Sequence, residues 1–257
     1  MTAFNVFYIT CPNCNATLTG KKLRAIAINY SELYSDGKMV CNELISEPQK
    51  IIKCPSCANI FWLPEIVDEI DSEIRATPSD EVKEEKIAVY SYKSWYQFGC
   101  NTSLIEGKKA LIDHHFQLLV MLKPFTVEQE LYLRRSLLWA CNDLIRFEMV
   151  NKLSRLFSGS FSFQAWRRER HDRIIQKILF LKLNPVYKSN ISRMIELIKV
   201  TKEKESDKAY LAELYREKGN FAKAMEIVNE LHRSTHYVYQ IHKKITKKST
   251  SVFKVAG

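Results

Sequence analysis

Cys11-Pro12-Asn13-Cys14 and Cys54-Pro55-Ser56-Cys57 are the two stretches that decide the N-terminal fold of this chain. Each stretch has the Cys-x-x-Cys spacing, which lets one tight turn, or knuckle, present two thiolates to a single metal ion. Two knuckles complete a tetrahedral shell of four sulfur atoms, the arrangement of a structural zinc ribbon. The sequence therefore predicts a structural Zn²⁺ site whose ligands are Cys11, Cys14, Cys54 and Cys57.

The same residues leave two other kinds of chemistry open. A tetrahedral shell of thiolates also accepts iron, as in rubredoxin-like sites, and a Cys-x-x-Cys pair can act as a redox dithiol. Two matching pairs favour metal binding over redox chemistry. Four thiolates leave no coordination position for water, which argues against a hydrolytic zinc site.

The other three cysteines lack a Cys-x-x-Cys partner. Cys41 lies between the knuckles, where it could substitute as a ligand, but a half-buried free thiol is the expected role. Cys100 and Cys141 are interpreted as apolar packing residues.

The composition is that of a soluble globular protein with long helices. The chain has 257 residues, 46% of them hydrophobic and 26% charged, with only seven glycines and seven prolines. No run approaches the roughly 20 apolar residues that span a bilayer. The N-terminus lacks a secretory pattern, and an odd number of cysteines fits a reducing compartment. We expect a cytoplasmic protein with no membrane association.

Positive charge is concentrated in the C-terminal two thirds of the chain. Residues 1–86 contain nine Lys and Arg against 13 Asp and Glu, a balance of −4. Residues 87–257 contain 30 and 16, a balance of +14. A ribbon that grips phosphates should carry its own basic residues, and this ribbon largely lacks them.

These features predict an α+β, mainly α fold in three parts. Residues 1–65 form a zinc ribbon with a long insertion between the knuckles, 66–86 an acidic helix or linker, and 87–257 an α-helical domain. In the ribbon, strands are expected over Phe4–Thr10, Leu23–Tyr34 and Asn59–Leu63. Ser35-Asp36-Gly37-Lys38 supplies a turn, with Gly37 suited to a positive φ.

The helical part is predicted from caps, breakers and apolar periodicity. A helix over Ser103–Met121 is stopped by Pro124, and Thr126 with Gln129 matches a capping box for the next helix. Asn184-Pro185 is expected to separate a helix over about Gln164–Leu183 from another over about Ser189–Thr201.

Residues 206–233 have the spacing of small and large residues found in a tetratricopeptide (TPR) repeat. Ala212 and Ala224 let two antiparallel helices approach closely, Tyr215 fills the space between them, and Gly219 makes the turn. The pattern occurs once, so the earlier helices must supply the neighbouring surface.

The chain resembles uncharacterised bacterial proteins that join an N-terminal zinc ribbon to a C-terminal TPR-like helical region. The resemblance rests on both Cys-Pro-x-Cys knuckles and on residues spread over most of the chain: Tyr34-Ser35-Asp36-Gly37, Phe61-Trp62, Leu133-Arg134-Arg135, Trp139, Asn142-Asp143, Arg146 and the Leu211–Phe221 segment. It implies that ribbon and helices form one recurring unit, and it implies no activity.

Two further groups of residues are candidates for function. Arg167, Arg168, Arg170 and Arg173 could bind phosphates or an acidic protein face, although a solvated helix face is the simpler interpretation. Asn142 and Asp143, with Trp139 and Arg146 beside them, could recognise a ligand or form a buried Asp143–Arg146 interaction.

No catalytic motif is recognisable, because His114-His115 lacks a His-Glu-x-x-His pattern and no phosphate loop or nucleophile elbow occurs. The sequence therefore predicts a non-enzymatic module that binds an unidentified protein partner. The alternative is a nucleic-acid-binding protein that uses its basic helical half.

Overall fold

The chain folds as two compact units. A computed structural model describes residues 3–25, 31–41, 50–63, 104–123, 125–146, 163–201, 205–231 and 235–256. One unit holds Met1–Ser31 and Val40–Cys100, and the other holds Glu32–Met39 and Asn101–Gly257. Small antiparallel strands at the N-terminus and a mainly helical remainder confirm the α+β, mainly α fold class. The predicted boundaries at 65 and 87 stay predictions, because they lie outside the described residues, as does the acidic segment 66–86.

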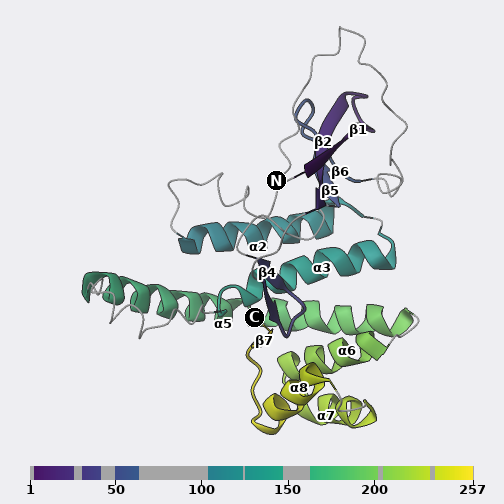
Figure 1. The fold of residues 1–257 in the computed structure, drawn as a ribbon. Coiled ribbons are helices and arrows are strands. Elements are labelled where there is room, and N and C mark those ends of the chain that lie inside the picture. The colour runs from purple at the N-terminus through teal and green to yellow at the C-terminus, as the bar shows by residue number, and fades with distance from the viewer. Residues whose placement is uncertain are drawn as a thin grey trace. The chain divides into compact units, whose positions relative to one another are not determined.

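Two antiparallel hairpins make up most of the described part of the first unit (Figure 1). The paired strands are β1 (Ala3–Thr10) with β2 (Thr17–Ala25), and β5 (Ile51–Lys53) with β6 (Ile60–Trp62). The strands predicted over Phe4–Thr10 and Asn59–Leu63 are thereby confirmed. The strand character predicted over 23–34 is confirmed at both ends of this range, by the last residues of β2 and by the strand β3 (Ser31–Tyr34), and residues 26–30 lie outside the described residues.

Helices make up most of the described part of the second unit. They are α2 (Leu104–Met121), α3 (Val127–Asn142), α5 (Phe163–Val200), α6 (Glu205–Lys218), α7 (Phe221–Glu230) and α8 (His236–Thr246). α3 packs against α2 and α5, and α6 packs against α5 and α7. Leu133, Leu137, Ile191 and Leu214 are at most 1% exposed and lie in the core. Burial of each such side chain contributes about 1.5–3 kcal/mol.

The start of α3 confirms the predicted capping box. The backbone N–H of Gln129 donates to the Thr126 hydroxyl, and the backbone N–H of Thr126 donates to the Gln129 side-chain oxygen. Both bonds satisfy N–H groups that have no partner within the helix, which fixes the point where α3 begins.

α5 contradicts the prediction of two helices separated at Asn184-Pro185. The helix continues through Pro185 to Val200. Proline inside a helix removes a backbone hydrogen bond and costs about 3 kcal/mol. The turns that follow carry Tyr187, Ile191 and Met194, which are at most 3% exposed. Packing of this apolar face offsets the penalty, so tertiary contacts override the local breaker.

α6 and α7 form the predicted helical hairpin. Gly219 has a φ of 90°, and its N–H donates to the carbonyl of Arg216. The Asn220 side chain accepts from the N–H of Lys223 and caps α7. Ala212 and Ala224 are fully buried, as helices in close contact require.

A short sheet joins the segment between the knuckles to the C-terminus. β3 (Ser31–Tyr34) lies between β4 (Met39–Cys41) and β7 (Lys254–Ala256). β3 pairs antiparallel with β7, with Leu33 opposite Ala256 and Tyr34 opposite Lys254. Gly37 has a φ of 77°, which confirms the predicted turn. The side chain of Cys41 is not among those described, and Cys100 lies outside the described residues.

Candidate metal centre

Each knuckle is the turn of one of the two hairpins in the first unit. In the first knuckle the N–H of Cys11 donates to the carbonyl of Ala16 at 2.9 Å, and the N–H of Asn15 donates to the carbonyl of Cys11 at 3.0 Å. The second knuckle repeats both bonds at equivalent positions. There, Cys54 donates to Asn59 at 2.8 Å and Ala58 donates to Cys54 at 2.9 Å. The sequence repeat is therefore also a repeat of backbone geometry.

The residue after each second cysteine has a left-handed backbone. Asn15 has a φ of 57° and Ala58 a φ of 59°. Asn adopts this region readily, whereas for Ala the contact between Cβ and the carbonyl costs about 1–2 kcal/mol. The second knuckle therefore forms against a local backbone penalty that the first knuckle largely avoids.

The hairpins bring the four cysteine sulfur atoms into one cluster. The Sγ atoms of Cys11, Cys14, Cys54 and Cys57 all lie within 4.8 Å of one another. Cys11 Sγ lies 3.7 Å from Cys57 Sγ, and Cys14 Sγ lies 3.6 Å from Cys54 Sγ. A disulfide requires about 2.05 Å, so these four thiols are free.

The sulfur separations fit coordination of one metal ion. Zinc–sulfur bonds of 2.3 Å in a tetrahedron place neighbouring sulfur atoms about 3.8 Å apart. The two shortest measured separations lie close to that value. The four cysteines can therefore hold one ion as a closed shell with ligands from both knuckles.

Electrostatics within the cluster also favour a cation. At Cys57, hydrogen bonds from the Asn13 side chain and the Asn59 backbone lower the pKa to about 6. At Cys14, the Ala16 backbone favours the thiolate, but local desolvation by neighbouring atoms and hydrogen bonds with the other three sulfur atoms raise the pKa to about 12, although the residue itself is exposed. Neighbouring thiolates resist simultaneous ionisation, and a bound dication removes that conflict.

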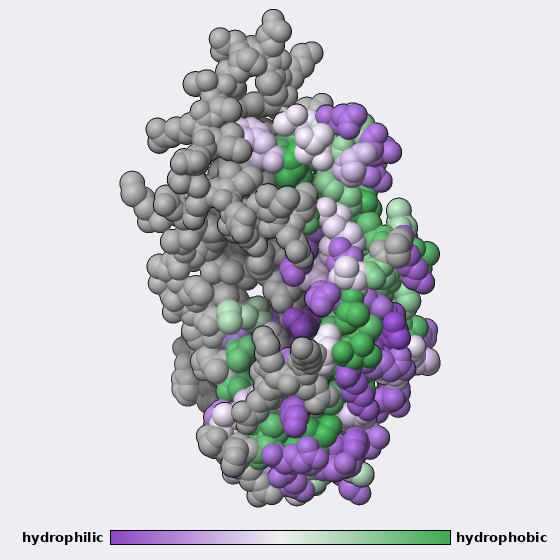
Figure 2. Space-filling view, turned by 90° about the vertical axis from the view of Figure 1, so that its right-hand side faces the viewer, coloured by the Kyte–Doolittle hydropathy of each residue, from purple (hydrophilic) through white to green (hydrophobic). Residues whose placement is uncertain are grey.

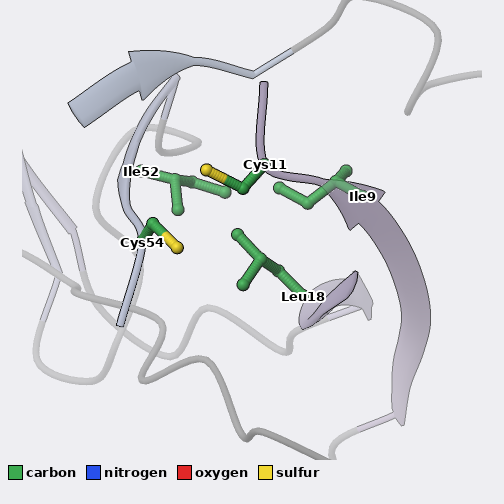
Figure 3. Close-up of a cluster of buried hydrophobic side chains, with 5 residues drawn as sticks. All are labelled: Ile9, Cys11, Leu18, Ile52 and Cys54. Atoms are coloured by element: carbon green, nitrogen blue, oxygen red, sulfur yellow. The ribbon is translucent and has the colours of Figure 1, made fainter. Parts of the chain in front are cut away.

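A small apolar core supports one side of the cluster. Ile9, Leu18 and Ile52 pack with Cys11 and Cys54, as Figure 3 shows. Cys11 and Cys54 are at most 1% exposed, whereas Cys14 is exposed. The apolar side therefore shields two of the four candidate ligands from water, whereas Cys14 is accessible to it.

The basic residues predicted for binding lie on α5, away from the cysteines in sequence. Arg167 and Arg170 are exposed and Arg173 is half-buried, whereas the side chain of Arg168 is not among those described. Their role in binding an acidic partner stays a prediction.

The structure brings together the predicted polar group, which consists of Trp139, Asn142, Asp143 and Arg146. This group also binds Asp36, which the sequence did not indicate as a site residue. Arg146 Nη1 donates to Asp143 Oδ1 at 2.8 Å, as predicted. Asn142 Nδ2 also donates to Asp36 Oδ2 at 2.8 Å, and Trp139 Nε1 donates to the Asp36 carbonyl at 2.9 Å. The Ser35-Asp36-Gly37 turn motif was the available signal, but its partner helix could not be read from the sequence.

The same cluster continues into two buried residues of α5 and α6. Tyr187 donates to Glu217 Oε2 at 2.6 Å and contacts Asn142 Oδ1 at 2.9 Å. Burial, together with the Glu213 and Asp36 carboxyl groups, raises the pKa of Glu217 well above its ordinary value. Asp36, Asn142, Tyr187 and Glu217 are at most 3% exposed, so a solute has little access to them. These groups hold the fold together.

The sequence also singles out Cys141 and the His114-His115 pair. Cys141 is buried, in agreement with a packing role. The ring nitrogens of His115 are buried, although the residue as a whole keeps some exposed surface. His114 lies beside it with a ring-centroid separation of 5.9 Å. Among the described residues, the only clustered set of potential metal ligands is the four cysteines.

Comparison with known proteins gives no relative: no family model, no curated protein and no solved structure matches this chain. The resemblance to bacterial zinc-ribbon proteins therefore rests on the quoted motifs alone. Within the part of the chain that the structure describes, no helix is both long and apolar enough to cross a bilayer.

Proposed function

We propose that this protein is a non-enzymatic interaction module in which a structural zinc ion holds the ribbon and the helical unit carries the docking surface. The closed cluster of four thiolates is the observation that carries the proposal. Such a shell leaves no position for a substrate or an activated water molecule, so the ion stabilises structure. Zinc is favoured over iron because structural ribbons of this ligand set hold zinc.

The docking surface that we propose is one exposed face of α5. Its members recur at helical spacing and combine positive charge with apolar area: Arg167, Arg170, His171, Ile174, Ile178 and Leu181. The three apolar residues are 51%, 47% and 67% exposed. Of the described side chains in α5 before Tyr187, only Gln176 is buried, so this half of the helix contributes little to the core.

The partner that fits this α5 face is an acidic amphipathic protein helix. From Arg167 to Leu181 the face is about 21 Å long, because a helix rises 1.5 Å per residue. A partner helix of similar length can cover the apolar residues with an i, i+4, i+7 stripe. Acidic residues beside that stripe would meet Arg167 and Arg170.

The helical hairpin gives the proposal a second element. We assign α6 and α7 as one TPR-like unit, since Ala212 and Ala224 are fully buried, Tyr215 is 8% exposed and Gly219 makes the turn. The closely packed pair gives α5 a firm support, because α6 packs directly against it.

Nucleic-acid binding is the second candidate. The balance of +14 in residues 87–257 and the exposed arginines of α5 favour it. Figure 2 shows one face of the molecule, on which hydrophilic and hydrophobic residues are interspersed. The proposed α5 face likewise combines its arginines with exposed Ile174, Ile178 and Leu181, and this mixture suits a protein partner better than a phosphate backbone.

Site-specific cross-linking tests the proposal. A photo-cross-linking residue is placed at Ile178 in the full-length protein, with the exposed position Lys188 of the same helix as the control. The proposal predicts a protein adduct at position 178 that survives nuclease and is lost when Arg167 and Arg170 are changed to Glu. A nuclease-sensitive adduct would support nucleic acid, and equal labelling at both positions would contradict a docking face.

A further inference from the structure

The segment between the two knuckles is embedded in the helical unit. Glu32–Met39 belongs to the same compact unit as Asn101–Gly257, although the chain on both sides of this segment belongs to the ribbon unit. At its tip, Tyr34 N–H donates to the carbonyl of Lys38 at 2.9 Å, and Gly37 N–H donates to the carbonyl of Tyr34 at 3.0 Å. The segment is therefore a formed β-hairpin, here called the inserted hairpin (residues 32–39).

Ser35 is fully buried, and each of its polar groups has a partner in the helical unit. Its N–H donates to the carbonyl of Phe253 at 2.9 Å, and its hydroxyl accepts from the N–H of Phe253 at 3.2 Å. Its carbonyl accepts from the hydroxyl of Tyr237 at 2.8 Å. A side chain without a hydroxyl would leave the Phe253 N–H without this acceptor.

Asp36 is also fully buried and is held by three residues of α3 and the turn after it. Asn142 and Arg146 both donate to its Oδ2 atom, the first at 2.8 Å, and Trp139 donates to its carbonyl. Its Oδ1 atom accepts from the N–H of Lys38 at 3.2 Å. This position therefore selects for both charge and size. Only a short carboxylate can accept hydrogen bonds from the Asn142 amide, the Arg146 guanidinium and the Lys38 N–H of its own turn at the same time.

The residues on either side of Ser35-Asp36 extend the contact. The guanidinium of Arg146 lies over the ring of Tyr34 at 4.4 Å from its centroid. Lys38 Nζ donates to Asp143 Oδ2 at 2.5 Å. A Cβ at Gly37 would lie 3.9 Å from the Tyr210 ring, so the turn sits directly against α6.

We propose that the helical unit contains a recognition site for a Ser-Asp-Gly turn, and that the inserted hairpin is the ligand which fills it. The ligand is a β-hairpin with an acidic residue buried at its tip. The site recognises it through hydrogen bonds to that carboxylate and through addition of its strand to β7. Without that occupant, Asn142 would keep only the longer bond to Glu217 at 3.4 Å and Arg146 would keep only Asp143 among the acceptors described above. The Tyr237 hydroxyl would lose the Ser35 carbonyl, and each lost acceptor carries a free-energy cost in a buried site.

This proposal is independent of which metal the cysteines bind and of what docks on α5. It makes the helical unit discontinuous in sequence, because its fold requires residues from between the two knuckles. It also explains the buried Asn142 and Arg146 without a small-molecule ligand, because the chain itself supplies the group that they bind.

The test uses the full-length chain with residues 32–39 replaced by a Gly/Ser segment of the same length. A fluorescently labelled peptide spanning residues 30–41 is then titrated into this variant. The proposal predicts that the peptide binds the Gly/Ser variant saturably and that the same peptide carrying Asp36→Asn binds at least tenfold more weakly. It also predicts no binding of the peptide to the wild-type chain, because the inserted hairpin already fills the site there. Equal affinity of the two peptides, or equal binding to the wild-type chain, would overturn the proposal.

A second measurement covers the case in which the Gly/Ser variant does not fold. Wild-type protein and the single variants Asp36→Asn and Glu32→Gln are compared by hydrogen exchange at the Phe253 amide. Glu32 lies in the same hairpin, where it accepts from the Tyr34 hydroxyl and from the exposed Lys254 side chain. Loss of protection by at least tenfold in Asp36→Asn alone supports the site, and unchanged protection in Asp36→Asn overturns it.

Discussion

Arg146 Nη2 donates a hydrogen bond to Oδ2 of Asp36, a residue 110 positions earlier in the chain. The side chain of Arg146 is 7% exposed and that of Asp36 is fully buried. Arg146 also binds Asp143 through Nη1, so one guanidinium joins two carboxylates inside the helical unit. A buried pair of this kind depends on both partners, because either charge alone would be poorly compensated.

Arg146→Met is expected to destabilise the protein strongly. Removal of the guanidinium leaves the Asp36 carboxylate buried, and such a change costs about 3–5 kcal/mol. Urea unfolding measures this loss. The control is Arg193→Met, whose side chain is 46% exposed and pairs with Glu130 and Glu196. An exposed pair contributes about 0–1 kcal/mol, so equal losses in the two variants would contradict the buried cluster.

His115 should make the folded state sensitive to acid. Its ring nitrogens have no hydrogen-bond partner among the described residues, and burial, with His114 and Lys38 nearby, lowers its pKa to about 3. The unfolded chain binds the proton near pH 6.5, whereas the folded chain does not. Because only the unfolded chain takes up this proton, the free energy of unfolding falls as the pH drops below 6.5. The loss is about 1 kcal/mol between pH 7 and 5.5.

Urea unfolding at pH 7 and pH 5.5 checks this dependence. His115→Leu should remove that part of the pH dependence, whereas His236→Leu, at an exposed position, should keep the wild-type profile. A wild-type-like slope in His115→Leu would show that other groups cause the acid sensitivity.

Ala58→Gly should stabilise the second knuckle, against the usual effect of this substitution. Glycine removes the Cβ contact at a φ of 59°, a gain of about 1–2 kcal/mol. It also adds freedom to the unfolded chain, a loss of about 0.4–1 kcal/mol. Metal retention against a chelator should therefore be equal to or better than wild type.

Ala16→Gly is the matched control in the first knuckle. Ala16 has no positive φ and packs against the apolar core of the ribbon. Glycine there should lower stability by about 0.5–1 kcal/mol. If both substitutions weaken metal retention alike, backbone strain at Ala58 has no energetic role.

Local signals in the sequence predicted most of the elements but not their long-range partners. The Cys-x-x-Cys spacing, the capping box at Thr126 and the turns at Gly37 and Gly219 each follow from a few neighbouring residues, and the structure confirms them. The break expected at Pro185 was wrong because burial of the following turns is a tertiary effect.

The placement of Asp36 could not be predicted for a related physical reason. A short Ser-Asp-Gly turn is compatible with an exposed hairpin or a buried one, and nothing local distinguishes them. Only the contacts with Asn142, Arg146 and Phe253 decide it. The Asp143–Arg146 pair, in contrast, was predictable, since the two residues lie three positions apart.

Cys54→Ser should abolish binding of the metal and destabilise the ribbon. Serine is a poor ligand for zinc, and three thiolates cannot complete the shell. Metal content per chain and thermal melting measure the effect. Cys141→Ala removes a buried cysteine outside the cluster and should keep the wild-type metal content. Loss of metal in both variants would point to general unfolding instead of a lost ligand.

The most direct test of the metal centre is native mass spectrometry of the purified full-length protein, combined with X-ray absorption at the metal edge. One zinc ion per chain, with four sulfur neighbours at about 2.3 Å, is the expected result. A chain that carries no stoichiometric metal, or an ion surrounded by nitrogen or oxygen atoms, would contradict the four-cysteine site.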